Sequence, residues 1–224
     1  FSYDGQNFKN YTNMDGLPDN QANDLYIEDN ETIWVTTGNG AAVFNGETFK
    51  TIWETDNDDA LSFGNSSAVA KSKDGVFFFG QGNRGVIIYD PNSLRNTTKS
   101  DGFKRSPISD IQFDKDNNLW LASWWGRGLQ LIEDGKITKN ITVRDGLPSG
   151  RVNEIDFTSD GTMWIATRNG VATYKNNKIE KIIKVDDGLP DNNVISLSID
   201  KNDNIWFYTP AGLTRYNGDS YTTY

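Results

Sequence analysis

Residues 145–177 read DGLPSGRVNEIDFTSDGTMWIATRNGVATYKNN, and this pattern returns along the chain at intervals of 42 or 44 residues. Each copy has an apolar residue followed by a large aromatic residue, then a glycine six to eight positions later. The aromatic residues are Trp34, Phe78, Trp120, Trp164 and Trp206, and the glycines are Gly40, Gly85, Gly128, Gly170 and Gly212. A fixed period of this length is the signature of a repeat architecture.

The segments within one copy are short and extended. An alternating segment such as NEIDFTS precedes a turn rich in Asp, Asn and Gly, and the aromatic strand follows that turn. After the glycine, a segment such as GVATYKNNKIEKII holds two further short strands about a turn. No stretch keeps the 3.6-residue period of an amphipathic helix over a useful length. The sequence therefore predicts an all-β fold with four antiparallel strands in about 43 residues per copy.

Four-stranded units repeated at this length predict a β-propeller, in which neighbouring sheets pack face to face around an axis. The recurring tryptophan is expected to pack between these sheets, because nearly every copy carries it. Residues 1–11 resemble the last two strands of a unit, and we expect them to form a hairpin of a preceding blade. We interpret residues 1–224 as one propeller domain or as a piece of a longer propeller; the alternative is that the hairpin closes the ring. The expected blades are residues 20–55, 64–98, 107–141, 149–184 and 191–224.

Composition excludes several classes of function. The chain has no cysteine and no histidine, so it lacks the commonest general base, the usual zinc ligands and every Ser-His or Cys-His pair. A formal net charge of −9 offers no basic surface for nucleic acid or for an anionic membrane. No run approaches the roughly 18 apolar residues of a membrane span. We therefore expect a protein that is not an enzyme, binds no metal or cofactor, and makes no direct membrane contact.

The copies beginning at Asp15, Asp145 and Asp187 resemble a known family. They read DGLPDNQANDLYIEDNETIWVTTGNGAAVFNGETF, DGLPSGRVNEIDFTSDGTMWIATRNGVATYKNN and DGLPDNNVISLSIDKNDNIWFYTPAGLTRYNGDSY, which is similar to the two-component regulator propeller repeat. The second and third copies match more loosely, with Phe78 in place of the tryptophan in the second. The resemblance implies the periplasmic sensor region of a hybrid two-component system, where such repeats sense oligosaccharides. It also implies a periplasmic or extracellular location and dimerisation through a parent sensor.

The turn after the aromatic strand differs between copies and is the predicted ligand site. Relative to the other copies, the second inserts one residue and the third inserts two. Propeller geometry puts these turns on the face that also carries the DGLP loops, and the inserted turns would lie side by side in adjacent blades. Exposed aromatic rings can stack on a sugar, and guanidinium groups can bind hydroxyls or a carboxylate; the alternative is that one tryptophan packs between blades. The predicted ligand-binding residues are Trp124, Trp125, Arg127, Arg84, Asn83, Gln81 and Arg168.

Three acidic residues lie ten positions before the aromatic anchor, on what would be the innermost strand. These residues are Asp24, Asp110 and Glu154, and the same position holds Ala68 and Ser196 in the other copies. We expect the three acids to line the central channel. A cation such as calcium would suit carboxylates there, but polar residues lining a hydrated channel are the preferred interpretation.

Three functions are therefore compared. The first is a non-enzymatic propeller that senses an oligosaccharide or another small ligand. The second is a scaffold for protein interactions, for which a flat face without a pocket would be the sign. The third is a polysaccharide lyase, which would have to use Tyr, Lys, Arg or carboxylates as catalysts, because histidine is absent. We favour the first.

Overall fold

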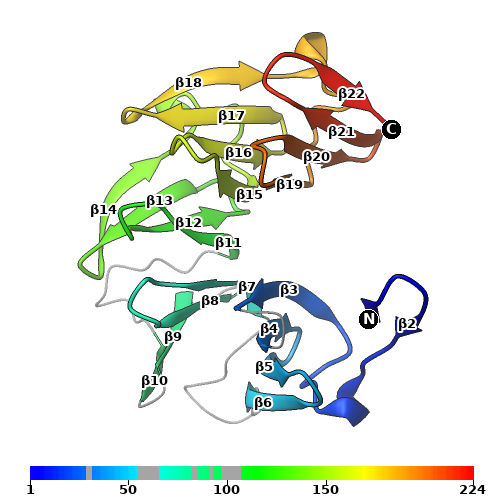
Figure 1. Cartoon of the computed structure of the whole chain (residues 1–224). Coiled ribbons are helices and arrows are strands. Elements are labelled where there is room, and N and C mark those ends of the chain that lie inside the picture. The colour runs from blue at the N-terminus through cyan, green and yellow to red at the C-terminus, as the bar shows by residue number, and fades with distance from the viewer. Residues whose placement is uncertain (29–31, 55–65, 82–84, 91–92, 97–106) are drawn as a thin grey trace. The chain divides into compact units, whose positions relative to one another are not determined.

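The chain folds into short antiparallel sheets that follow one another in sequence (Figure 1). The computed structural model describes residues 1–28, 32–54, 66–81, 85–90, 93–96 and 107–224. Within those ranges it contains one two-stranded hairpin and five four-stranded sheets, each a meander of consecutive strands. The predicted fold is confirmed: these sheets are five blades of a β-propeller. The chain divides into two compact units, residues 1–97 and 98–224.

The first unit contains the hairpin and two blades. The hairpin pairs β1 (Ser2–Tyr3) with β2 (Phe8–Lys9), where the rings of Tyr3 and Phe8 stack. Blade one consists of β3 (Ala22–Ile27), β4 (Thr32–Thr37), β5 (Gly40–Asn45) and β6 (Phe49–Glu54). Blade two consists of β7 (Ser66–Lys71), β8 (Phe77–Gln81), β9 (Gly85–Asp90) and β10 (Ser93–Asn96).

The second unit contains three blades. Blade three consists of β11 (Ile108–Phe113), β12 (Leu119–Ser123), β13 (Gly128–Glu133) and β14 (Lys136–Ile141). Blade four consists of β15 (Val152–Phe157), β16 (Met163–Thr167), β17 (Gly170–Lys175) and β18 (Lys178–Ile183). Blade five consists of β19 (Ser196–Ile199), β20 (Ile205–Thr209), β21 (Gly212–Tyr216) and β22 (Tyr221–Thr223).

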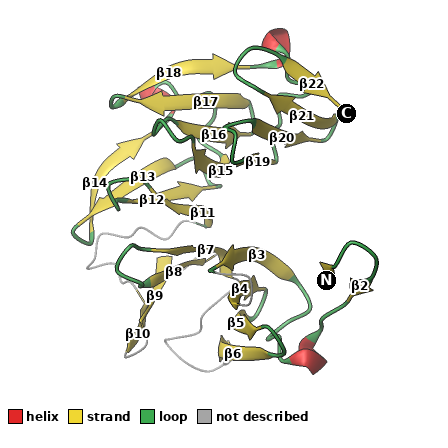
Figure 2. Ribbon diagram, in the orientation of Figure 1, coloured by secondary structure: helices red, strands yellow, loops and turns green. Residues whose placement is uncertain are grey.

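Each DGLP sequence begins inside a single turn of 3-10 helix, and these turns are the helices of Figure 2. They are η1 (Asn13–Asp15), η3 (Val143–Asp145) and η4 (Val185–Asp187). In η3 the Asp145 carboxylate accepts the N–H of Thr142 (2.8 Å), and Gly146 follows with φ of 106°, a left-handed conformation that favours glycine. Leu147 is then buried in the core between blades three and four. This loop therefore caps its own turn and contributes a buried leucine to the core.

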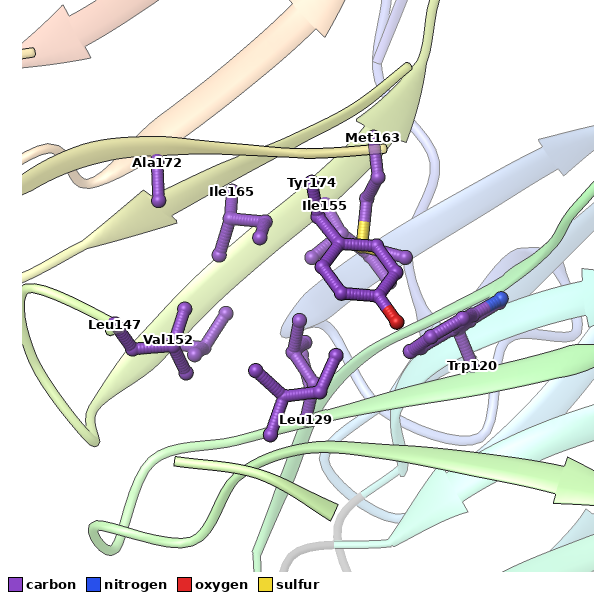
Figure 3. Packing of buried hydrophobic residues seen from close by; sticks show 11 residues of the cluster. Trp120, Leu129, Leu147, Val152, Ile155, Met163, Ile165, Ala172 and Tyr174 are labelled. Atoms are coloured by element: carbon purple, nitrogen blue, oxygen red, sulfur yellow. The ribbon is translucent and has the colours of Figure 1, made fainter. Parts of the chain in front are cut away.

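The core of the second unit lies between blades (Figure 3). One cluster joins Trp120 and Leu129 of blade three to Ile155, Met163 and Tyr174 of blade four, and the rings of Trp120 and Tyr174 meet edge to face at 5.5 Å. Neither sheet could bury both of its apolar faces alone, so this packing holds adjacent blades together. Trp34 and Trp164 are buried in equivalent clusters, which confirms the predicted position of the repeated tryptophan in blades one, three and four, whereas Trp206 of blade five is only half-buried.

Candidate functional site

The turn between β12 and β13 is the expanded turn that the sequence predicts. It consists of residues 124–127, whereas the equivalent turns of blades one, four and five are residues 38–39, 168–169 and 210–211. The insertion therefore lengthens the turn and leaves the flanking strands paired, with Ser123 opposite Gly128. We call residues 124–127 the expanded turn.

Both tryptophans of the expanded turn reach solvent. The side chain of Trp124 is 38% exposed and that of Trp125 is 69% exposed, and Arg127 is half-buried beside them. By contrast, Trp120, four residues before Trp124, is 4% exposed. Both tryptophans are therefore more exposed than the core residue Trp120, and whether Trp124 also packs against a neighbouring blade stays open.

A glycine in the following loop packs closely against the expanded turn. The N–H of Gly128 donates to the carbonyl of Gly150 (3.0 Å). A Cβ atom on Gly150 would lie 2.8 Å from the carbonyl oxygen of Gly126 and 2.9 Å from its Cα, closer than such atoms can approach. In the loop before blade five the same position holds Asn192, whose side chain accepts the N–H of Val185 (3.0 Å). The loop that contacts the longer turn thus has glycine where the loop before blade five has asparagine.

Arginines continue from the expanded turn onto blade four. Arg151 follows Gly150, and its carbonyl accepts the N–H of Arg168 (3.2 Å). Both of these side chains are exposed. The ion pairs among the described residues, Lys71–Glu28 and Lys175–Asp160, include none of Arg127, Arg151 and Arg168. Three arginines that form no ion pair with a described carboxylate therefore lie in the expanded turn or on the segments next to it, in a chain whose net charge is negative.

Sequence reasoning named Arg127 and Arg168 but missed Arg151. The signal was the residue before it, because Gly150 stands where two other DGLP loops carry Asn20 and Asn192. A glycine at that position next to the two-residue insertion indicates close backbone approach.

The predicted residues of blade two are only partly described. Gln81 ends β8 and has no exposed surface, which weighs against direct ligand contact by its side chain. Asn83 and Arg84 lie outside the described residues. Their place beside the expanded turn stays a prediction.

The three predicted channel acids bind the next blade. Asp24 accepts the N–H of Val69, and Asp110 accepts that of Ile155, each at 2.8 Å. Glu154 accepts the N–H of Leu197, also at 2.8 Å. We call these contacts inter-blade carboxylate bonds. They were not foreseen from the sequence, and whether the same side chains also line a channel stays a prediction.

A β-bulge at the inner strand sets up these bonds. In blades three and four the register shifts between Ile108 and Asp110 and between Val152 and Glu154. Bulges re-aim side chains by adding one residue to a strand. The bulged residues Ser109 and Asn153 also reach the next blade, where they donate to the carbonyls of Val152 (2.8 Å) and Val194 (2.6 Å) respectively. Two successive side chains therefore connect each of these blades to its neighbour.

Comparison with protein families identifies the repeat. Residues 146–169 and 188–209, which span the DGLP loops and inner strands of blades four and five, match the two component regulator propeller family. The two matched segments are two-component regulator propeller repeats. The matched segments include the loop that contacts the expanded turn and the anchors Trp164 and Trp206. No curated protein matches the chain.

Solved structures with propellers of this kind are similar to the chain. The extracellular domain of a B. thetaiotaomicron protein described as a hybrid two component system is 26% identical, with a TM-score of 0.73 over 88% of this chain and 28% of that one. Another from the same organism, described as a one component system, is 18% identical with a TM-score of 0.73 over 91% and 30%. The chain spans less than a third of either domain. Inactive H270A virginiamycin B lyase from Staphylococcus aureus, with quinupristin, is 16% identical with a TM-score of 0.74 over 96% and 72%.

Two further features were sought among the described residues: a membrane-spanning helix and a cluster of metal-binding side chains. None of their helices is long and apolar enough to cross a membrane. No group of three or more acidic side chains among them is placed to hold a metal ion.

Burial perturbs two of the inner-strand carboxyls of these repeats. Burial raises the pKa of Asp24, and the N–H groups of Val69 and Leu25 partly oppose it. Asp156 accepts the N–H of Ile199 (2.9 Å) in the same way as the inter-blade carboxylate bonds, and burial raises its pKa too. A raised pKa means that the folded state holds the proton to higher pH than the unfolded chain.

We expect the free energy of unfolding of Asp156→Asn to fall less steeply with rising pH than that of the wild type. The folded protein binds more protons than the unfolded chain between the ordinary pKa of 3.8 and the raised value, so its stability falls as pH rises through that window. Urea unfolding from about pH 4 to about pH 7 measures this slope. The exposed Asp116→Asn is the control, and equal slopes in the variant and the wild type would contradict the expectation.

Proposed function

We propose that this propeller is the ligand-sensing part of an extracytoplasmic, periplasmic sensor and binds a carbohydrate or a related small molecule without transforming it. Similarity to the extracellular domain of a hybrid two component system supports the sensor role. Sensing in this scheme requires binding and not turnover. The proposed ligand presents a flat ring face together with hydroxyl or carboxylate groups.

The observation that carries the proposal is the pair of exposed indole rings on the expanded turn, together with nearby arginines that pair with no described carboxylate. Apolar rings as large as tryptophan are usually buried unless they serve binding. A planar guanidinium group recognises a carboxylate in a bidentate manner and also stacks on rings. Gly150 fixes the backbone of the turn, so the rings are presented by a supported surface.

A lyase activity is less well supported. The virginiamycin B lyase is inactive when one histidine is replaced by alanine, and this chain contains no histidine. Its 16% identity supports a shared fold alone.

Binding to a glycan array followed by calorimetry tests the proposal. We expect Trp124→Ala and Trp125→Ala each to weaken binding of an array-selected oligosaccharide about fivefold, because a stacked ring contributes about 1 kcal/mol. Met14→Ala, which removes a side chain that is 96% exposed, is the control and should bind as the wild type does.

A second variant keeps both tryptophans and tests whether the close packing of Gly150 positions the expanded turn. Gly150→Asn restores the residue of the other loops and should displace the expanded turn, so that binding weakens while far-ultraviolet circular dichroism is unchanged. If neither tryptophan variant changes binding, the proposed site is wrong. If no oligosaccharide binds but a protein partner does, the scaffold interpretation replaces this one.

A further inference from the structure

Blades four and five enclose a second candidate site, away from the expanded turn. A groove of about 730 Å³ runs along β18, between blade four and the β21–β22 hairpin of blade five. Its lining includes Trp164, Lys181, Ile183, Tyr216 and Tyr221. The volume lies within the range of small-molecule sites, about 300–1,000 Å³.

The equivalent groove between blades three and four is smaller. It has a volume of about 320 Å³. The ammonium group of Lys139 on β14 crosses to blade four, where it donates to the hydroxyl of Tyr174 (3.2 Å) and to the side chain of Asn177. This lysine and its partners form a bridge across the groove.

The described residues of blades four and five do not form the equivalent bridge. Lys181 stands on β18 where Lys139 stands on β14, but it makes no hydrogen bond or ion pair with the described residues. Tyr216 takes the place of Tyr174, and its hydroxyl donates instead to the carbonyl of Gly218 within its own turn. An ammonium group that lines the groove is therefore free to bind a ligand.

The tryptophan of this groove also lacks the partner that other copies have. The indole N–H of Trp120 donates to the Asp114 carboxylate (3.0 Å), six residues before it. Six residues before Trp164 the chain has Thr158, whose hydroxyl bonds to Asp160 (2.8 Å). No described residue accepts the indole N–H of Trp164. It remains a donor on the wall of the groove.

Aromatic rings provide a stacking surface in the same groove. The rings of Tyr216 and Tyr221 stack at 4.6 Å, and Trp164 lies 5.7 Å from Tyr216. Burial raises the pKa of Tyr221 to about 12, with smaller contributions from Tyr216 and Asp187, so its phenol stays neutral. The apolar edges of this tyrosine pair beside hydrogen-bond donors suit a ligand that has both apolar C–H surface and hydroxyl groups.

The charges of the lining point to a neutral ligand. Two ammonium groups face four carboxylates, one of which, that of Asp160, is paired with Lys175 at 2.5 Å. The lining carboxylates belong to Asp160, Glu180, Asp187 and Asp203. An anionic ligand would meet this excess of negative charge, whereas a neutral polyhydroxylated ligand can both donate to carboxylates and accept from Lys181 and Trp164.

We propose that the groove between blades four and five binds a neutral oligosaccharide of two or three sugar rings. The sugar rings pack against the accessible edges of the Tyr216–Tyr221 pair, and sugar hydroxyls accept hydrogen bonds from Lys181 and from the indole of Trp164. This site is separate from the expanded turn and does not depend on the role proposed for Trp124 and Trp125.

The test combines calorimetry with NMR of the tryptophan side chains in the whole chain. The probes are maltotriose, cellotriose, xylotriose, mannotriose and laminaritriose, with a trimer of galacturonic acid as the anionic comparison. The indole resonance missing from Trp164→Phe assigns that N–H. We expect at least one neutral trisaccharide to shift this resonance and Lys181→Met to weaken its binding about tenfold, with retention of the fold checked by circular dichroism.

The matched control is Lys178→Met, which removes the same charge from an exposed position on the same strand and should leave binding unchanged. The Trp124→Ala, Trp125→Ala double variant should also bind normally, which separates this site from the expanded turn. The proposal is overturned if no neutral trisaccharide shifts the Trp164 resonance, if Lys178→Met weakens binding as much as Lys181→Met, or if the galacturonic acid trimer is preferred.

Discussion

Gly128→Ala is expected to lower the free energy of unfolding of the second unit by about 3 kcal/mol or more. Gly128 begins β13 with φ of 68°, where an alanine is strained. A Cβ atom there would also lie 2.0 Å from the carbonyl oxygen of Ile141 and 2.9 Å from the Leu147 side chain. Because the carbonyl belongs to the outer strand of the same blade, relief of the clash requires the sheet to separate.

A neighbouring glycine separates the two causes of this loss. Gly126 has φ of 75°, but a Cβ atom on it would meet nothing within 4 Å. Gly126→Ala should therefore show only the conformational strain, about 1 kcal/mol. Urea unfolding of both variants, followed by tryptophan fluorescence, gives the comparison. Equal losses in the two variants would show that the contact with Ile141 is not the cause.

Asp110→Ala is expected to lower the free energy of unfolding by about 3 kcal/mol. The buried Asp110 carboxylate accepts the N–H of its neighbour Ile111 (2.7 Å) and that of Ile155 in the next blade (2.8 Å). Hydrogen bonds to a charged group are worth about 1.5–3 kcal/mol, and alanine would leave both buried donors without that acceptor. The loss should appear locally as faster hydrogen exchange at the amide of Ile155.

The control for this variant is Asp116→Ala, in the exposed turn between β11 and β12. Surface substitutions of this type usually change stability by no more than about 0.5 kcal/mol. Asp110→Asn should fall between the two, because an amide has one acceptor oxygen. An Asp110→Ala protein that unfolds with wild-type stability would show that the inter-blade carboxylate bond is dispensable.

Local patterns predicted the blades well, because their causes are local. The spacing of Trp34, Trp120, Trp164 and Trp206 fixed the period, and Asp-Gly pairs marked turns that require a capping carboxylate and a left-handed residue. The length of the expanded turn could be counted from Trp120 to Gly128. Both features depend on residues within one unit of the repeat.

Contacts between repeats could not be predicted in the same way. The direction of the Asp110 side chain depends on a bulge that alternation does not reveal, so its bond to the next blade could not be foreseen. Lys139 and Lys181 occupy equivalent positions in the sequence pattern. Among the described residues only Lys139 has a side-chain partner, and its partners Tyr174 and Asn177 lie in the next blade. The contact of Gly150 with the expanded turn likewise joins segments about twenty residues apart.

The inter-blade carboxylate bond joins a side chain of one blade to the main chain of the next. Main-chain amides are common to almost all residues, so the receiving strand needs no particular sequence. Val69 and Leu197 are held in this way although their own blades carry Ala68 and Ser196 at the acidic position. During evolution, a blade can therefore be duplicated or exchanged without a compensating substitution in the strand that receives it.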